Sequence, residues 1–226
     1  VRGRRRGATP LGSRTIDPVL TMGTLLALAA LAYLCGSVPT GVWLARRRGV
    51  DPRDIGSGNI VATNVARAAG NAAGALTLVG DTVKGLGPVL LATHLGVGDG
   101  GRAFVALSAF TGHIFPCFLG FQGGKGVAIS LGVLLGLAPL GMAIAVPLFL
   151  LTVAVSRYVS LGSILTAAAT PIVLTALRYP TSTIIVAGLM GICIAYRHRD
   201  NIRRLRFGTE ARVGGRRSAF RASGYA

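Results

Sequence analysis

The chain has 226 residues, of which 51% are hydrophobic and 14% are charged, and its mean hydropathy is +0.61. Soluble domains carry about 25% charged residues, so this composition argues against an ordinary soluble fold and favours a membrane protein. The net charge of +17 is also typical of nucleic-acid-binding proteins, but no fold-forming segment has a basic face interleaved with aromatic residues. We therefore expect no nucleic-acid partner.

Apolar stretches dominate the chain after a basic start. Residues 1–18 are rich in Arg and Gly, and we expect a disordered basic N-terminal tail there. Residues 19–210 are predicted to form one all-α integral membrane domain with seven transmembrane helices, and residues 211–226 a basic C-terminal tail. The predicted spans cover 19–45, 72–92, 102–120, two stretches that divide 126–156 at Pro139 and Gly141, then 160–177 and 180–197.

The distribution of Lys and Arg predicts the orientation of these spans. If the N-terminus lies outside, 16 cations fall on the cytoplasmic side and seven on the other. Cytoplasmic loops of membrane proteins are enriched in Lys and Arg. We therefore expect the N-terminus outside and the C-terminus in the cytoplasm. This topology places three of the four polar clusters described next on the cytoplasmic side, where they could share one site.

The first polar cluster is Gly56-Ser57-Gly58-Asn59, just before a helix expected to begin near Ala62. Glycine N–H groups, neutral side-chain donors and a helix N-terminus together suit a phosphate group. Arg67 lies about one turn beyond Asn64, where a guanidinium could bind the same anion in a fork. A helix-capping loop with an ordinary loop arginine would give the same pattern.

The second cluster is the pair Asp81 and Lys84, which lie three residues apart within a predicted span. Charges inside the membrane are costly and are usually paired or functional. In one interpretation Lys84 reaches an anion while Asp81 holds it in place. In the other, the two residues only form a salt bridge with each other.

The third cluster runs from His113, near the end of the third span, to Gly123-Gly124-Lys125-Gly126 at the start of the next. A lysine between glycines at a membrane edge can cradle a phosphate, because the backbone can approach the anion closely. A lone histidine in an apolar helix is more often a hydrogen-bonded core residue, but the glycines and lysine that follow His113 favour a functional role.

The fourth cluster follows the last span and begins with His198 and Asn201, three residues apart on one helical face. The arginines that follow are typical of a basic membrane exit attracted to anionic lipid. That interpretation accounts for the arginines but not for His198, Asn201 or Glu210.

Together the four clusters resemble the bacterial acyl-phosphate-dependent glycerol-3-phosphate acyltransferases (the PlsY family). The chain carries GSGNIVATNVAR, GDTVKG, GHIFPCFLGFQGGKGVAIS and HRDNIRRLRFGTE in the family's order and spacing, over residues 33–210. The resemblance implies a multi-pass enzyme of the bacterial inner membrane, with its active site facing the cytoplasm. It would transfer a fatty acyl group from acyl phosphate to the sn-1 hydroxyl of glycerol 3-phosphate, giving lysophosphatidic acid and inorganic phosphate. It implies no cofactor and no metal, contact with membrane lipids, and cooperation with an enzyme that makes acyl phosphate.

The resemblance also assigns roles to individual residues. Ser57, Lys125 and His198 would be catalytic, and with Arg67 and Asn201 they would line the glycerol 3-phosphate site. Ser57 would also help to hold the acyl-phosphate head with Asn59, Thr63 and Asn64. The remaining substrate-binding positions are Gly56, Gly58, Lys84, His113, Gly123, Gly124, Gly126 and Glu210. No covalent enzyme intermediate is required, because phosphate is already a good leaving group; the base is His198 or the acceptor's own phosphate.

Two departures from the family pattern leave other functions open. Val61 stands where the family usually has glycine, and a β-branched residue there would restrict the backbone and crowd an anion. Gln122 replaces a usual lysine and removes one positive charge. A catalytically idle homologue therefore stays possible. An organophosphate transporter would use the same basic pocket, but no convincing internal repeat supports one.

Overall fold

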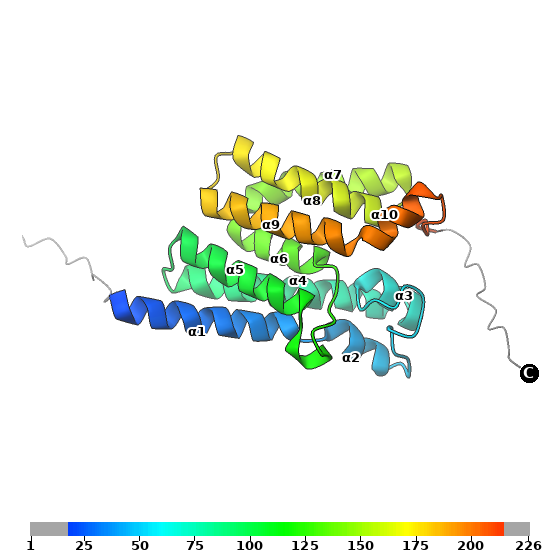
Figure 1. Cartoon of the computed structure of the whole chain (residues 1–226), viewed down its shortest axis with the longest axis horizontal. Helices are drawn as coiled ribbons and strands as arrows, with labels where there is room; N and C mark the ends of the chain where they lie inside the picture. The colour runs from blue at the N-terminus through cyan, green and yellow to red at the C-terminus, as the bar shows by residue number, and fades with distance from the viewer. Residues whose placement is uncertain (1–17, 215–226) are drawn as a thin grey trace, which may run out of the picture.

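The computed structural model describes residues 18–214, which form a bundle of helices (Figure 1). The predicted all-α class is confirmed for these residues. In chain order the helices are α1 (Pro18–Ser37), α2 (Thr40–Arg46), α3 (Ala62–Ala69), α4 (Asn71–His94), α5 (Asp99–Ile114), the 3-10 helix η1 (Cys117–Leu119), α6 (Val127–Leu137), α7 (Pro139–Ser156), α8 (Val159–Ala176), α9 (Thr181–Arg197) and α10 (Arg199–Arg206).

Not all seven predicted spans are equally long. Among the described residues, five helical stretches are long and apolar enough to cross a membrane: Met22–Arg46, Asn71–His94, Asp99–Leu119, Pro139–Ser156 and Val159–Ala176. Helices α9 and α10 make a sixth if their 57° bend is taken as part of one span. Helix α6 is apolar but has only 11 residues. Each predicted stretch thus contains a helix, while five or six reach spanning length.

Prolines determine where several of these helices end. The predicted division of 126–156 is confirmed, since α6 ends at Leu137 and α7 begins at Pro139, a position where the missing N–H is not needed. The first predicted span is interrupted, because Pro39 separates α1 from α2 and disfavours helical backbone in the residue before it. The third ends at Ile114 rather than at residue 120, just before Phe115 and Pro116.

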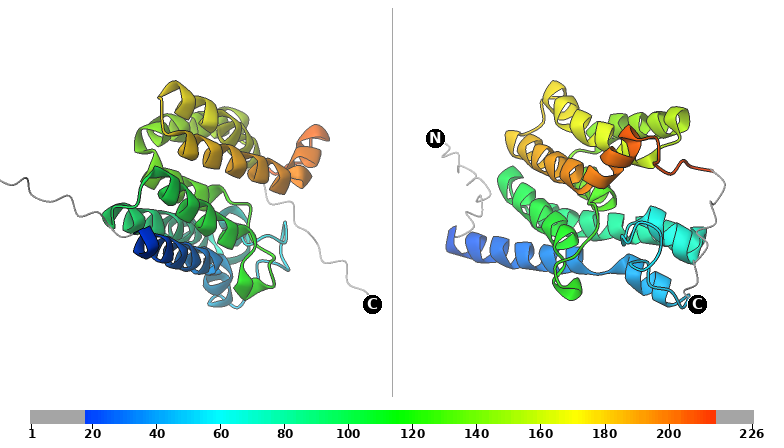
Figure 2. Two further views of the ribbon diagram at one scale, coloured as in Figure 1. Left: turned by 60° about the vertical axis from the view of Figure 1, so that its left-hand side comes forward. Right: turned by 45° about the vertical axis from the view of Figure 1, so that its right-hand side comes forward.

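Small residues allow the helices to pack backbone against backbone, as is common in membrane proteins. A Cβ atom at Gly112 of α5 would lie 2.1 Å from the carbonyl oxygen of Tyr33 in α1. One at Gly132 of α6 would lie 1.9 Å from the carbonyl oxygen of Thr82 in α4. Large apolar side chains on the outer faces remain exposed, as expected for surfaces that meet lipid. Figure 2 shows the same lengthwise packing from two further directions.

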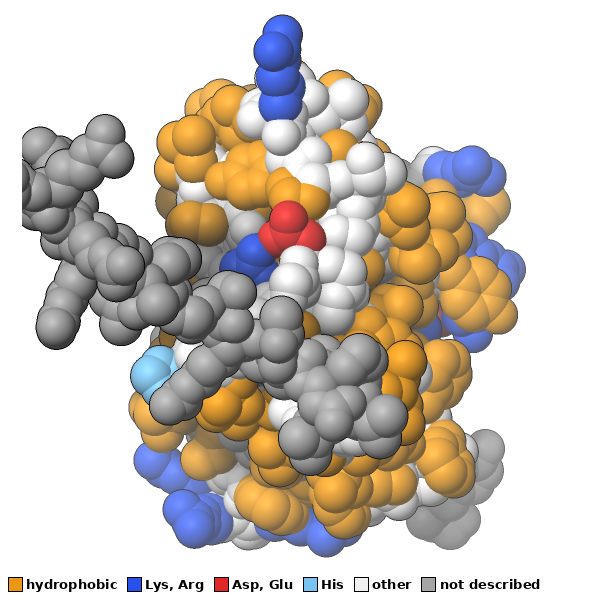
Figure 3. Space-filling model, turned by 90° about the vertical axis from the view of Figure 1, so that its left-hand side faces the viewer, with side chains coloured by type: hydrophobic (Ala, Val, Ile, Leu, Met, Phe, Trp, Pro, Cys, Tyr) orange, Lys and Arg blue, Asp and Glu red, His pale blue; other side chains and the backbone are white. Residues whose placement is uncertain are grey.

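The two ends of the bundle differ in chemistry. The start of α1 and the α4–α5 and α8–α9 connections lie at one end, and α2, α3 and α10 lie at the other (Figures 1 and 2). Figure 3 faces the first end, where hydrophobic side chains dominate the uncovered surface and Lys and Arg lie mainly at the rim. Residues of three of the four polar clusters gather at the second end.

The predicted tails fall almost wholly outside the described residues. Of the predicted C-terminal tail, residues 211–214 are described, and they continue the fold. The Val213 N–H donates to the carbonyl oxygen of Arg157 at 2.8 Å, and the Arg157 guanidinium donates back to the Val213 carbonyl oxygen. Residues past 210 therefore contact the end of α7.

Candidate active site

A charged pocket of about 150 Å³ opens at the polar end of the bundle. Three separate segments contribute to it: the α2–α3 loop, the loop before α6, and the junction between α9 and α10. Its lining residues are Ser57, Asn59, Lys125, Arg197, Arg199, Asp200 and Arg204. Three of the four polar clusters thus meet in one place.

Asn64 gives the α2–α3 loop its shape. Its side chain is fully buried, and its amide nitrogen donates to the carbonyl oxygens of Pro52, Ile55 and Asn59 at 2.7, 3.0 and 2.8 Å. Its amide oxygen accepts the backbone N–H of Ser57 at 3.0 Å. These bonds use both the amide nitrogen and the amide oxygen of Asn64, so this side chain holds the loop in its conformation. The predicted direct contact between Asn64 and a substrate stays a prediction.

The backbone around this loop needs glycine at some positions and tolerates a side chain at others. Gly56 and Gly58 have φ values of 63° and 65°, in the left-handed region that favours glycine. Val61, by contrast, has φ −70° and ψ 153°, which a β-branched residue adopts easily. The restricted backbone expected of a β-branched residue is therefore accommodated at Val61 without strain. Helix α3 begins at Ala62, as predicted.

Thr63 and Arg67 project from α3 and are exposed. Neither belongs to the lining of the charged pocket. Arg67 still acts at a distance, because its charge is one of the causes that lower the pKa of Lys125. The structure therefore places Arg67 near the pocket rather than in its wall.

Lys125 reaches the pocket from a tightly built loop. Burial, reinforced by the charge of Arg204, lowers the pKa of its ammonium group to about 8. Its Nζ donates a hydrogen bond to Oδ1 of Asn201. The following Gly126 has φ 87°, and a Cβ atom there would lie 2.5 Å from the Phe110 ring, so only glycine fits at this turn.

Glu210 supports this arrangement from behind the pocket. Its carboxylate accepts hydrogen bonds from Asn201 Nδ2 at 2.6 Å, Ser160 Oγ at 2.7 Å and Arg204 Nε at 2.7 Å. Burial raises the pKa of this carboxyl group, but the three hydrogen bonds together hold it below its usual value. An ionised Glu210 thus ties α8 to α10 and orients Asn201 toward Lys125.

His198 lies at the bend between α9 and α10 with 3% of its surface exposed. Its Nδ1 is 2.8 Å from the carbonyl oxygen of Ile194, and because a carbonyl only accepts, Nδ1 carries the proton. Burial lowers the pKa of the ring to about 4. The imidazole is therefore neutral at pH 7, with an Nε2 lone pair that makes no hydrogen bond to the described residues. It can act as a base, although it stands beside the pocket lining rather than in it.

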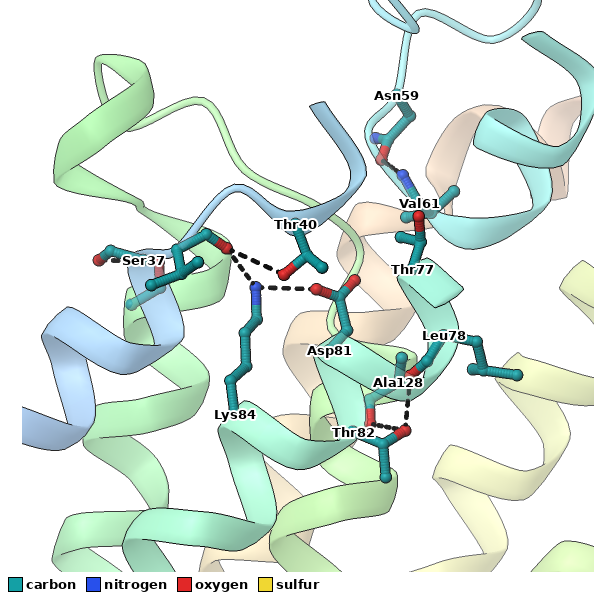
Figure 4. Close-up of polar contacts among 12 residues, drawn as sticks. Ser37, Thr40, Asn59, Val61, Thr77, Leu78, Asp81, Thr82, Lys84 and Ala128 are labelled. Atoms are coloured by element: carbon teal, nitrogen blue, oxygen red, sulfur yellow. Dashed lines mark hydrogen bonds and ion pairs between the residues drawn. The ribbon is translucent and has the colours of Figure 1, made fainter. Parts of the chain in front are cut away.

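The second cluster stays apart from the charged pocket. Lys84 Nζ lies 2.9 Å from Asp81 Oδ1 and donates to the carbonyl oxygen of Val38 at the end of α1. Figure 4 shows Lys84 pointing toward these two oxygens, and no dashed contact joins the pair to Asn59. The structure thus contains the salt bridge that the sequence left as one alternative, and contact between Lys84 and a substrate anion stays a prediction.

His113 packs beneath the glycine loop. It is 2% exposed, and a Cβ atom at Gly124 would lie 2.2 Å from its Nε2. Gly123 and Gly124 are themselves buried. These three predicted substrate-binding residues therefore shape the loop that carries Lys125 and do not line the pocket.

Four residues of the lining were not predicted as site residues: Arg197, Arg199, Asp200 and Arg204. For Arg204, one of the arginines after Asn201, the sequence offered a basic membrane exit as one interpretation. A helical spacing was nevertheless visible, because Arg197, Asn201 and Arg204 follow one another at intervals of four and three residues. That spacing places the arginines on the face that carries Asn201.

Comparisons with known proteins agree with one another. A family model described as "Glycerol-3-phosphate acyltransferase" matches residues 26–208. A glycerol-3-phosphate acyltransferase of Geobacter sulfurreducens is 51% identical, over 83% of this chain and 96% of the relative, and one of Geobacter metallireducens is 53% identical over the same shares. One of Agrobacterium fabrum is 46% identical, over 86% of this chain and 95% of the relative.

Two solved structures are also similar. Both are crystal structures of PlsY (YgiH), described as an integral membrane glycerol 3-phosphate acyltransferase, one in a glycerol 3-phosphate form and one in a lysophosphatidic acid form. The TM-scores are 0.82 and 0.80, with 40% sequence identity over 85% of this chain and 96% of each solved chain. Because proteins that are 40% identical share a fold, the bundle described above is that of an integral membrane protein.

Proposed function

We propose that this chain, which belongs to the glycerol-3-phosphate acyltransferase family, transfers a fatty acyl group from acyl phosphate to the sn-1 hydroxyl of glycerol 3-phosphate. The products are lysophosphatidic acid and inorganic phosphate, and an enzyme that makes acyl phosphate supplies the donor. The observation that carries the proposal is the meeting of Ser57, Asn59, Lys125 and three arginines in one small pocket of an otherwise apolar bundle. Such a pocket suits phosphate head groups of molecules whose tails lie in lipid.

The reaction needs orientation and charge stabilisation more than a reactive side chain. The sn-1 oxygen attacks the acyl carbonyl carbon, the bond from that carbon to the phosphate oxygen breaks, and phosphate leaves with the electron pair. Lys125 and the arginines stabilise the negative charge on both phosphates, while the α2–α3 loop presents Ser57 and backbone N–H groups. The hydroxyl proton passes to Nε2 of His198 or to a phosphate oxygen of the acceptor.

For the membrane, we propose seven crossings of the bacterial inner membrane, with the N-terminus outside and the pocket facing the cytoplasm. The start of α1 and α10 lie at opposite ends of the bundle (Figure 1), which suits an odd number of crossings. Helix α6, about 16 Å long, would cross only with its ends shielded by protein. An impermeant maleimide should label Arg178→Cys in intact cells and Arg206→Cys only after permeabilisation. The reverse pattern would contradict this topology.

The test of function is an acyl-transfer assay on purified protein in detergent. Palmitoyl phosphate and labelled glycerol 3-phosphate are supplied, and lysophosphatidic acid and phosphate are counted. We expect the two products in equal amounts, and no product when acyl-CoA replaces the acyl phosphate. Folded protein that makes no product would support the catalytically idle homologue. Flux of glycerol 3-phosphate into liposomes without chemistry would support the transporter.

The activity should depend on pH through Lys125. The pKa of this residue is about 8, so its positive charge is present below pH 8 and lost above it. We expect kcat/KM for glycerol 3-phosphate to fall about tenfold per pH unit above that point. Lys125→Arg, whose guanidinium stays charged, should move the fall beyond pH 10. A wild-type profile that is flat to pH 10 would show that Lys125 does not bind the substrate as a cation.

Val61→Gly tests the departure from the family pattern. Val61 adopts an unstrained extended backbone and does not line the pocket. Restoring glycine should therefore leave turnover within about twofold of the wild type, since glycine at a helix N-cap changes stability by only a few tenths of a kcal/mol. The measurement is kcat at saturating concentrations of both substrates. A clear loss of turnover would mean that the valine side chain is needed to shape the loop.

A further inference from the structure

Arg197, the last residue of α9, contacts the backbone of the loop that carries Lys125. Its Nε donates to the carbonyl oxygen of Gly124 at 3.0 Å, and its Nη2 donates to the carbonyl oxygen of Gly123. A guanidinium carries five N–H donors in a rigid fork, so three remain free of these two carbonyls. The same side chain lines the charged pocket.

His113 holds the opposite side of this loop. The Gly124 N–H donates to the His113 carbonyl oxygen at 3.2 Å. The imidazole packs so closely that a Cβ atom at Gly124 would lie 2.2 Å from Nε2, and one at Gly123 would lie 2.0 Å from the His113 carbonyl oxygen. The two glycines are thus confined between α5 on one side and α9 on the other.

From these contacts we infer that Arg197 is a positioning residue, which clamps Gly123 and Gly124 against His113 and so fixes Lys125 toward the phosphate of the substrate. This inference rests on the proposed function. The clamp turns two carbonyl oxygens toward Arg197, where they cannot repel an anion in the pocket. It also holds Lys125 in the position from which its Nζ donates a hydrogen bond to Oδ1 of Asn201.

A lysine could not take over this role. Its ammonium group is a single point on a flexible stem, whereas the planar fork of arginine binds two adjacent oxygens at once. Arg197→Lys therefore keeps the positive charge in the pocket and removes the clamp. A role that depends on charge alone would survive this change.

The experiment measures kcat and the KM for glycerol 3-phosphate, together with the pH profile, in the wild type, Arg197→Lys and Arg203→Lys. Arg203 is exposed on α10 and does not line the pocket, so its variant is the matched control. In Arg197→Lys we expect the KM to rise about tenfold or more. The fall in activity near pH 8 should also move to higher pH, because a loosened loop exposes Lys125 to water. A smaller fraction of folded enzyme would lower only kcat.

A second pair of variants tests the other side of the clamp. Gly124→Ala places a methyl group against the His113 ring and should raise the KM in the same way. Adding His113→Ala makes room for that methyl and should recover part of the lost affinity. If Arg197→Lys does not fold in detergent, these two variants test whether the position of the glycine loop controls the KM.

The possible outcomes are distinct. Wild-type KM and an unchanged pH profile in a folded Arg197→Lys enzyme would overturn the clamp and leave the proposed function intact. A double variant no better than Gly124→Ala alone would overturn the part assigned to His113. An inactive wild-type protein would instead count against the proposed function itself.

Discussion

Lys125→Ala should lower kcat/KM for acyl transfer at least 100-fold. The side chain supplies a cation inside a half-buried pocket, where a charge acts more strongly on a phosphate than it would in water. It also comes from a loop whose glycines are shaped to present it. The measurement is the rate of lysophosphatidic acid formation at pH 7, with both substrates varied.

Stability provides the control for this variant. A buried ammonium group is costly to desolvate, as the lowered pKa of Lys125 indicates, so its removal should not reduce the melting temperature. Gel filtration and thermal unfolding should therefore match the wild type. A folded Lys125→Ala enzyme that keeps more than about a tenth of the activity would remove Lys125 from the proposed site.

Asn64→Asp should damage the enzyme almost as severely, although Asn64 does not face the pocket. The change is nearly isosteric, but it replaces a donor to three carbonyl oxygens by a carboxylate oxygen that they repel. We expect a loss of about 3 kcal/mol in the free energy of unfolding. The loop that carries Ser57 and Asn59 should move, and kcat/KM should fall on the order of 100-fold.

The matched control is Asn71→Asp. Asn71 is exposed at the start of α4, so the same chemical change there should leave both stability and activity near the wild type. Thermal unfolding and the acyl-transfer assay are run on both variants. Full activity in Asn64→Asp would show that the hydrogen bonds inside the loop are not needed to hold Ser57 in place.

Local signals in the sequence predicted much of this architecture. The start of α3 near Ala62 and the break before Pro139 follow from short-range backbone preferences. Glycine-rich clusters at the ends of apolar segments predicted which loops would meet, because their chemistry suits one ligand. The positive-inside bias then placed three clusters on the same side.

Other features depend on contacts that no local pattern encodes. An asparagine in a phosphate loop has the same donors whether it binds a ligand or, like Asn64, the loop itself. Lys84 and Asp81 could serve an anion or each other; the structure contains the ion pair, and Val38, just after α1, presents its carbonyl oxygen to Lys84. Arg197 and Arg204 enter the pocket wall from either side of the 57° bend, and a bend of that size cannot be inferred from spacing alone.

The Asp81–Lys84 pair also bears on how the protein is made. Both residues belong to α4, three positions apart, so the ion pair can form as soon as that helix forms, before any neighbour has packed. An isolated charge at the centre of a helix costs about 2.5–3.5 kcal/mol during insertion into the bilayer. Because the two charges cancel within one turn, α4 can leave the translocon as an electrically neutral segment. Its biogenesis then does not have to wait for the α1–α2 connection, where Val38 supplies a further oxygen to Lys84 only in the assembled bundle.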